Sequence, residues 1–329
     1  MSEFQYGIFG LRLRANQPLP GLERLPRQAA VDVELHLARS EDRARVPMAG
    51  LAWVPAAPPL PVWTAEGPGG YYLRLRYEAA GADAEFVIGP RGGHVWVSWS
   101  RDVTLGDVAA PLLGPVLGCV LRRRGATCLH GAALAVDGRA IVLLGVKGAG
   151  KSTTALALVR QGATLLADDI TVLSETASGP SVLAGPARLR LRPEPVAALC
   201  GPADVVRPMW SQEKGRPYKR YLDLPSRPTP AAAALAAIYL LGPRGEPIRE
   251  TTIVEEPILT ALPRLMAQRY VTFALDRDGQ ARDFESVTRL VRRIPVRQIH
   301  RPEGLERIDT VALAIVEDAR ALLLSAASP

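Results

Sequence analysis

The chain has 329 residues, of which 48% are hydrophobic, and this length favours two globular domains over one. Its net charge of +7 comes from scattered arginines without a long basic run or interleaved aromatic residues, so we expect no nucleic-acid partner. The three cysteines lack metal-ligand spacing, no signal-peptide pattern is visible, and prolines break the longest apolar run, 108–121, so we expect a cytoplasmic protein without a membrane span.

Residues 1–103 have the pattern of a β-rich domain. Short runs of β-branched and aromatic residues at 71–77, 86–88 and 95–97 are separated by Gly-Pro or Gly-Gly turns. His36 and His94 are each alone in a strand-like stretch, and we interpret them as sheet residues and not as metal ligands. Because the region shows no chemistry of its own, we expect it to serve in recognition.

Residues 104–124 are predicted to form a connecting helix. Apolar residues recur at helical spacing from 105 to 120, and the segment closes with three arginines followed by Gly125. Cations and a glycine are typical of the carboxyl end of a helix. Pro111 and Pro115 predict a kink or a break inside it.

A hairpin and a phosphate-binding loop come next. Asp137-Gly138 separates two apolar runs, 127–136 and 139–144, as in a tight β-hairpin. The second run leads into residues 145–153, which contain the pattern G-x-x-x-x-G-K-[ST] and open a helical pattern. Glycines let backbone N–H groups curl around an anion, and the positive end of the helix points at it. This order of strand, loop and helix favours nucleotide binding over a chance glycine-rich turn.

Nine residues of this loop are expected to bind the nucleotide. They are Gly145, Val146, Lys147, Gly148, Ala149, Gly150, Lys151, Ser152 and Thr153. Lys151 is expected to reach the β- and γ-phosphates, and the Ser152 hydroxyl is expected to bind Mg²⁺. ATP and Mg²⁺ are therefore the expected cofactors.

Two carboxylates follow the next predicted strand, residues 163–167. Ligands in α/β sheets bind beyond the carboxyl ends of the strands, where Asp168 and Asp169 are placed. Adjacent side chains at a strand end point in opposite directions, so one can approach a metal ion while the other faces an acceptor hydroxyl. His130 lies one hairpin upstream. The alternative interpretation is a solvated Asp-Asp turn.

The remainder of the predicted domain 125–329 mixes strands and helices. We predict a buried strand at 235–241 and helices at 258–266, 284–292 and 305–324. Residues 294–299 are predicted to be an edge strand, because Pro295 lacks the N–H that a central strand needs.

Lysine is rare in this chain and occurs at Lys147, Lys151, Lys214 and Lys219. Two of the four lie in the phosphate loop. The other two flank residues 215–218 in a polar stretch, next to Arg220. We interpret this stretch as a substrate or phosphate loop that closes over the nucleotide or holds an acidic acceptor, with a solvated loop as the alternative.

Three motifs together resemble the catalytic domain of the bacterial HPr serine kinase/phosphorylase family: Leu129-His130-Gly131, residues 145–152, and Leu166-Ala167-Asp168-Asp169. The resemblance implies an α/β fold, with a P-loop domain of the HPr-kinase/PEP-carboxykinase type behind the β-rich domain. It also implies site roles. Asp168 would be the base acting on the acceptor hydroxyl, assisted by His130, while Asp169 and Ser152 would hold Mg²⁺ and Lys151 would bind phosphate.

The chain departs from that family in three places. Val146-Lys147 stands where an acidic residue usually follows the first loop glycine, and no Glu-Ile-Arg-Gly-type signature, tied to phosphorolysis, follows Asp169. Residues 1–103 also look unlike the family's amino-terminal domain. The chain is more similar to the smaller HPr-kinase-related kinases, some of which accompany lasso-peptide clusters and phosphorylate a precursor peptide at its terminal serine.

The sequence thus favours an ATP-dependent kinase that transfers the γ-phosphoryl group to a serine hydroxyl on a peptide or small protein. A small-molecule kinase of the same fold stays open. A nucleotide-gated ATPase or binding module is less favoured, because the Leu-Ser-Gly-Gly-Gln signature of transport ATPases is missing from the sequence. The acceptor, the reverse phosphorylase reaction and a homo-oligomeric state are left open.

Overall fold

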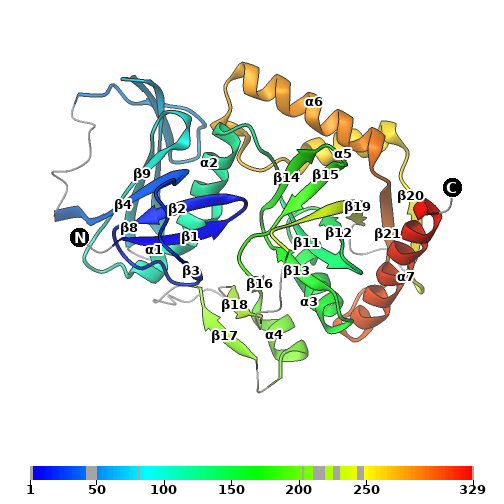
Figure 1. Ribbon diagram of the computed structural model, residues 1–329. Helices are drawn as coiled ribbons and strands as arrows, with labels where there is room; N and C mark the ends of the chain where they lie inside the picture. Colours follow the sequence, from blue (N-terminus) through cyan, green and yellow to red (C-terminus); the bar gives the residue numbers. More distant parts are fainter. Residues whose placement is uncertain are drawn as a thin grey trace. The chain divides into compact units, whose positions relative to one another are not determined.

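The structure is a computed structural model that describes residues 3–41, 50–79, 82–201, 204–209, 219–224, 230–242 and 248–327. Its contacts divide the chain into two compact units (Figure 1). The first is built mainly from residues 1–126, joined by 271–280, and the second takes up most of 127–329. The fold is mixed α/β with a β-rich amino-terminal region, as the sequence predicts.

The described part of the first unit forms a nine-stranded sheet in the order β3-β1-β2-β4-β9-β8-β7-β6-β5. Its strands are β1 Phe4–Ile8, β2 Leu11–Ala15, β3 Arg24–Leu25, β4 Val33–Arg39, β5 Val54–Pro55, β6 Val62–Gly67, β7 Gly70–Ala79, β8 Ala82–Ile88 and β9 His94–Trp99. The β2–β4 and β4–β9 pairs are parallel. Along β4 and β9 buried apolar residues alternate with more exposed ones, so each strand has an apolar and a polar face.

A broken helix completes this unit. It consists of α1 Leu105–Pro111, a π-helical turn Leu112–Val116 and α2 Leu117–Arg123. Thr104 and Asp107 form a capping box at its start, which satisfies two free N–H groups. The break predicted from the prolines is confirmed, because Gly114, between them, has the non-helical angles φ −106° and ψ −113°. Gly125, with φ 86°, closes the helix in the left-handed region, as predicted.

The same stretch is the one membrane-span candidate within the described ranges. Leu105–Arg123 is long and apolar enough to cross a membrane by length and composition. However, 83% of its most apolar window is buried inside the protein. Burial of this extent is what the core helix of a globular unit shows.

The second unit is organised around a mixed sheet with the order β10-β14-β15-β19-β12-β11-β13, to which β21 and β20 are added beside β19. The strands are β10 Thr127–Leu129, β11 Gly131–Val136, β12 Arg139–Leu144, β13 Thr164–Ala167, β14 Thr171–Thr176, β15 Gly179–Leu183, β19 Ala232–Leu241, β20 Thr252–Glu255 and β21 Val296–His300. A small sheet, β16-β18-β17, lies beside it, formed by β16 Arg188–Leu191, β17 Val205–Pro208 and β18 Arg220–Asp223.

Helices cover both faces of this sheet (Figure 1). They are α3 Lys151–Arg160, α4 Pro193–Leu199, α5 Ile258–Ala267, α6 Arg277–Arg293 and α7 Ile308–Ala327. Ala237, Tyr239 and Leu241 of β19 belong to a buried cluster that also contains apolar residues of α3 and α7. Ile238 and Leu240 point to the opposite face and are buried as well. A strand that is apolar on both faces is typical of a central position in an α/β sheet.

One strand prediction holds and one is wrong. Asp137 and Gly138, with φ 47° and 80°, form the tight turn between β11 and β12 that the sequence predicts. Residues 294–299 were expected at an edge, but β21 lies between β19 and β20. The sheet tolerates Pro295 because this residue precedes the strand and contributes its carbonyl oxygen, which accepts a hydrogen bond from the Ile238 N–H at 3.0 Å.

Candidate active site

The phosphate loop joins β12 to α3 through residues 145–150. Gly148 and Gly150 have φ of 87° and 92°, in the left-handed region that favours glycine. A Cβ atom on Gly145 would lie 3.1 Å from the Ala149 Cβ and 3.2 Å from the Leu241 carbonyl oxygen. Two of the glycines are therefore needed for their backbone angles and one for close packing.

Lys151 begins α3 and is buried against the loop. Its Nζ donates to the carbonyl oxygen of Gly145 at 2.7 Å and lies 3.4 Å from that of Val146. Burial lowers the pKa of Lys151, and the charge of Lys219 acts in the same direction, whereas Asp168 opposes the shift. The ammonium group is thus held at the centre of the loop, where an anion would gain most from it.

The first aspartate, Asp168, follows β13 and faces the start of α3. The Ser152 Oγ donates a hydrogen bond to Asp168 Oδ1 at 3.0 Å, and the Arg190 N–H donates to Oδ2 at 2.8 Å. Burial raises the pKa of this carboxyl, and the neighbouring charge of Asp169 raises it further, against the hydrogen bond from the Arg190 backbone. Asp168 therefore takes up a proton more readily than an ordinary aspartate.

The second aspartate, Asp169, has different partners. Its Oδ2 accepts from Arg190 Nη1 at 2.7 Å and from the Tyr270 hydroxyl at 3.3 Å. Its Oδ1 lies 3.7 Å from His130 Nδ1. Burial would raise the pKa of Asp169, but Arg190 and His130 outweigh it and lower the pKa. The backbone has φ 76°, a left-handed conformation that Asp adopts more readily than most residues and that often marks functional sites.

His130 lies beside Asp169 at the end of β10. Its Nδ1 is 3.0 Å from the Asp169 carbonyl oxygen, and its ring stacks on Tyr270 with centroids 6.0 Å apart. Burial lowers the pKa of His130, although Asp169 opposes that shift. Burial thus favours the neutral imidazole, and its contact with the carbonyl oxygen indicates that Nδ1 carries a proton.

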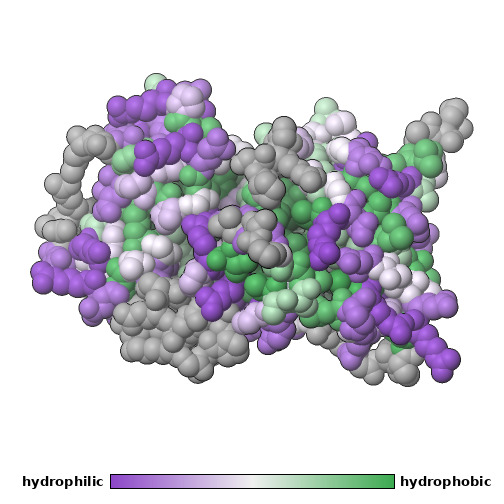
Figure 2. Space-filling model, turned by 90° about the horizontal axis from the view of Figure 1, so that it is seen from below, coloured by the Kyte–Doolittle hydropathy of each residue, from purple (hydrophilic) through white to green (hydrophobic). Residues whose placement is uncertain are grey.

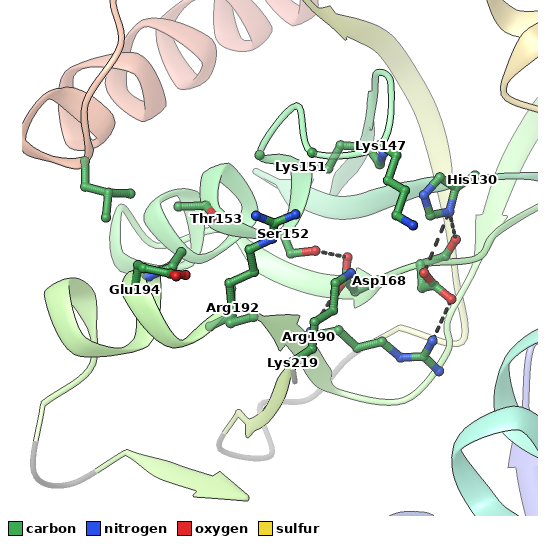
Figure 3. A pocket seen from close by; sticks show the side chains of 16 residues that line it. His130, Lys147, Lys151, Ser152, Thr153, Asp168, Arg190, Arg192, Glu194 and Lys219 are labelled. Atoms are coloured by element: carbon green, nitrogen blue, oxygen red, sulfur yellow. Dashed lines mark hydrogen bonds and ion pairs between the residues drawn. The ribbon is translucent and has the colours of Figure 1, made fainter. Parts of the chain in front are cut away.

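These side chains converge on one pocket (Figure 3). Its lining also contains the exposed or half-exposed groups Lys147, Arg192, Glu194 and Lys219. Lys219 therefore lies in the lining of the pocket that contains the phosphate loop. Arg220, its neighbour, begins β18 and is not among the lining residues. Lys214 lies outside the described residues.

Two oxygen donors in this lining, the Ser152 hydroxyl and the Asp168 carboxylate, lie next to each other and could hold a metal ion. Adjacent ligands of octahedral Mg²⁺ are about 2.9 Å apart when each metal–oxygen bond is about 2.0–2.1 Å. The 3.0 Å between Ser152 Oγ and Asp168 Oδ1 matches this spacing. The chemistry of the donor set, a hydroxyl and a carboxylate beside a phosphate loop, fits Mg²⁺.

Comparison with known proteins relates one segment of the chain to a protein family. Residues 124–190 match the family described as HPr Serine kinase C-terminal domain, and this range contains His130, the phosphate loop and both aspartates. The matched segment is related to the HPr serine kinases. Among solved structures, the HPr(Ser) kinase/phosphatase from Coxiella burnetii is similar at 14% identity, over 60% of this chain and 97% of its own, with a TM-score of 0.30. No curated protein matched the chain.

The HPr-kinase-related segment contains one site residue that the sequence did not reveal, Arg190, and a second, Tyr270, lies far outside it. Residues Arg188-Leu189-Arg190-Leu191 have the alternation of an amphipathic strand, and they form β16. The alternation alone does not show that Arg190 meets Asp169, because 21 residues separate them. Tyr270 is 101 residues from Asp169, and no local pattern marked it.

Proposed function

We propose that this chain is an ATP-dependent kinase that transfers the γ-phosphoryl group to a serine hydroxyl of a peptide or protein. The observation that carries the proposal is the Ser152–Asp168 hydrogen bond at the mouth of the phosphate loop. It joins the hydroxyl expected to bind a metal ion to a carboxyl with a raised pKa. Phosphoryl transfer needs a metal-binding group and a group that orients or deprotonates the acceptor.

The contacts favour a different metal site from the one expected from the sequence. Ser152 would hold Mg²⁺, and its neighbour Asp168 would face the acceptor hydroxyl. When bound, Mg²⁺ neutralises charge on the β- and γ-phosphate oxygens. Asp169 was expected to be a metal ligand. Its contacts with Arg190, Tyr270 and His130 favour a positioning role for it instead.

Asp168 is the residue we propose as the base. The acceptor hydroxyl oxygen forms a bond to the γ-phosphorus while the bond from that phosphorus to the β,γ-bridging oxygen breaks. Asp168 accepts the hydroxyl proton, and ADP leaves with the electron pair of the broken bond. A carboxyl whose pKa lies above the usual value is a stronger base than ordinary aspartate, which suits this step.

The charges around the mouth support an acidic acceptor segment. Lys147, Arg192 and Lys219 belong to the lining and are exposed, so they remain accessible to a bound molecule. Cations arranged around a phosphate site attract carboxylates next to the reacting hydroxyl as well as the phosphates themselves. We therefore propose a serine flanked by acidic residues or by a terminal carboxylate.

Labelling with γ-phosphate-labelled ATP tests the proposal. The purified chain, Mg²⁺ and a panel of serine peptides with acidic, neutral or basic flanks should yield a labelled peptide whose phosphate survives acid and is lost in alkali. Threonine and alanine replacements of the serine serve as controls. Label that appears only as inorganic phosphate would make the protein an ATPase. Label that enters only small metabolites of an added extract would replace the peptide by a small-molecule acceptor.

A further inference from the structure

The polar face of the amino-terminal sheet brings together two of the four histidines of the chain. Strands β4 and β9 pair in parallel, with Glu34 opposite His94 and His36 opposite Trp96. Paired residues, and residues two apart on a strand, lie on the same face of a sheet. The opposite face is occupied by buried apolar residues such as Leu35 and Val95. Glu34, His36 and His94 therefore form a polar cluster on the accessible side, which we call the His–Glu cluster.

The ligand atoms of this cluster point at one another. His36 Nε2 and His94 Nδ1 are 3.2 Å apart, and Glu34 Oε2 lies 3.9 Å from the first and 3.7 Å from the second. Two ligands of tetrahedral Zn²⁺ are about 3.3–3.5 Å apart, given Zn–N and Zn–O bonds of about 2.0–2.2 Å. The two imidazole rings would have to turn so that the lone pairs of His36 Nε2 and His94 Nδ1 both point at the metal ion. The ion would then replace the hydrogen bond between the rings. The side chains are 34–51% exposed, which leaves them room to turn.

The surroundings orient the three groups. Arg14, which pairs with Glu34 across β2 and β4, has its Nη1 3.4 Å from Glu34 Oε1, and this leaves Oε2 directed at the histidines. Trp96 stacks on both imidazoles, with centroid distances of 5.5 Å to His36 and 5.7 Å to His94. Partners that fix the ligating side chains are a regular feature of metal sites in proteins.

We propose that Glu34, His36 and His94 bind a divalent first-row transition-metal ion of the zinc type, independently of the phosphate-loop site. Imidazole nitrogen with one carboxylate oxygen is a donor set that suits Zn²⁺ and its neighbours better than Mg²⁺. Three protein ligands leave the fourth tetrahedral position open to water or to a group from a bound molecule.

Trp96 provides the readout for the test. The chelator-treated full chain is titrated with Zn²⁺ by calorimetry and with Co²⁺ by tryptophan fluorescence, in millimolar Mg²⁺ so that the phosphate-loop carboxylates are occupied. One Zn²⁺ per chain is expected, and Co²⁺ should quench the fluorescence because its open d shell lies next to the indole. Trp96→Phe keeps an aromatic ring against both imidazoles, so it should still bind Zn²⁺ while losing most of the quenching.

Single variants assign the ligands. His36→Ala and His94→Ala should each weaken Zn²⁺ binding more than about 10-fold, which is the least that even outer-shell partners usually contribute, and Glu34→Gln should weaken it as well. His300→Ala is the matched control and should bind like the wild type. Melting temperatures in chelator show whether the variants remain folded. Equal Zn²⁺ affinity in wild type and His94→Ala, or wild-type fluorescence indifferent to Co²⁺, would overturn the proposal.

Discussion

Asp168 and Asp169 are adjacent in the chain, yet the fold gives them opposite electrostatic environments. Asp168 accepts hydrogen bonds from a hydroxyl and a backbone N–H, and burial dominates, so its pKa is raised. Asp169 meets the Arg190 guanidinium, which with His130 outweighs the effect of burial and lowers its pKa. Two titratable groups whose pKa values are pushed apart are a common basis for separate acid–base and positioning roles.

Asp168→Asn is expected to abolish most phosphoryl transfer. The amide keeps the size of the carboxylate but cannot accept the hydroxyl proton, so kcat should fall about 100-fold or more. ATP affinity, measured calorimetrically, should change little, because the amide oxygen can still accept the Ser152 hydrogen bond. The matched variant Asp169→Asn should reduce kcat less. If Asp169→Asn proves inactive while Asp168→Asn transfers phosphate normally, the two roles are exchanged.

The pH dependence of transfer offers a second test. The charge of Asp169 raises the pKa of both Asp168 and His130, so its removal lowers both. Groups with lower pKa values stay unprotonated to a lower pH. The acid limb of the kcat profile should therefore move to lower pH in Asp169→Asn. Asp137→Asn, in the distant hairpin turn, should leave the acid limb in place. A shift of the acid limb to higher pH in Asp169→Asn would refute this account of Asp168 and Asp169.

Lys151→Ala tests the nucleotide site itself. A ligand that binds only the native state raises the melting temperature in proportion to the logarithm of its concentration over its Kd. Removal of the buried ammonium takes away the cation at the centre of the loop. ATP with Mg²⁺ should then no longer raise the melting temperature, whereas Arg139→Ala, at the exposed start of β12, should respond like the wild type. An undiminished shift in Lys151→Ala would remove the basis for the site.

At the scale of elements, the phosphate loop shows what its glycines contribute beyond stability. Gly148 and Gly138 have φ of 87° and 80°, and a Cβ on either would meet no atom within 4 Å. Alanine at either position suffers the same backbone penalty, about 1–2 kcal/mol for a left-handed residue. The two positions differ in their neighbourhood, because Gly148 lines the pocket and Gly138 turns a hairpin.

Gly148→Ala and Gly138→Ala therefore form a matched pair. Both should lower the free energy of unfolding by a similar amount, seen as similar shifts of the denaturation midpoint in urea. Only Gly148→Ala should also weaken ATP binding, because its backbone N–H would turn away from the phosphates. Equal ATP affinity in the two variants would mean that this glycine does not shape the anion site.

The elements that the sequence predicted correctly are those with a local signal. The Asp137-Gly138 turn, the phosphate loop and the broken helix each depend on residues within a few positions of one another. What escaped prediction depends on pairing between distant strands. The position of β21 follows from its pairing with β20, and the His36–His94 contact spans 58 residues. Neither register can be read from a local pattern, and for this reason the histidines were interpreted as isolated sheet residues.

At the scale of the whole molecule, the net charge of +7 is distributed, not concentrated in one run. Figure 2 shows hydrophilic and hydrophobic residues interspersed over the face seen from below. The exposed cations with a proposed task are those in the lining of the phosphate pocket, Lys147, Arg192 and Lys219. Exposed charges act over about 10 Å at moderate salt, so their effect on an acceptor should depend on ionic strength.

Lys219→Gln tests this role with an acidic serine peptide as the acceptor. In the wild type, KM for the peptide should rise with NaCl, because screening weakens the attraction between the acidic peptide and the exposed cations of the pocket lining. Lys219→Gln should raise KM for the peptide at low salt and reduce the salt dependence of KM. The value of kcat should stay nearly unchanged, because Lys219 would stabilise the bound peptide and the transition state equally. The melting temperature should stay within about 2 °C, because exposed substitutions seldom exceed about 0.5 kcal/mol. Arg139→Gln removes an exposed charge away from the pocket and should behave like the wild type. If instead KM for ATP rises and that for the peptide does not, Lys219 serves the nucleotide and the acidic preference must come from elsewhere.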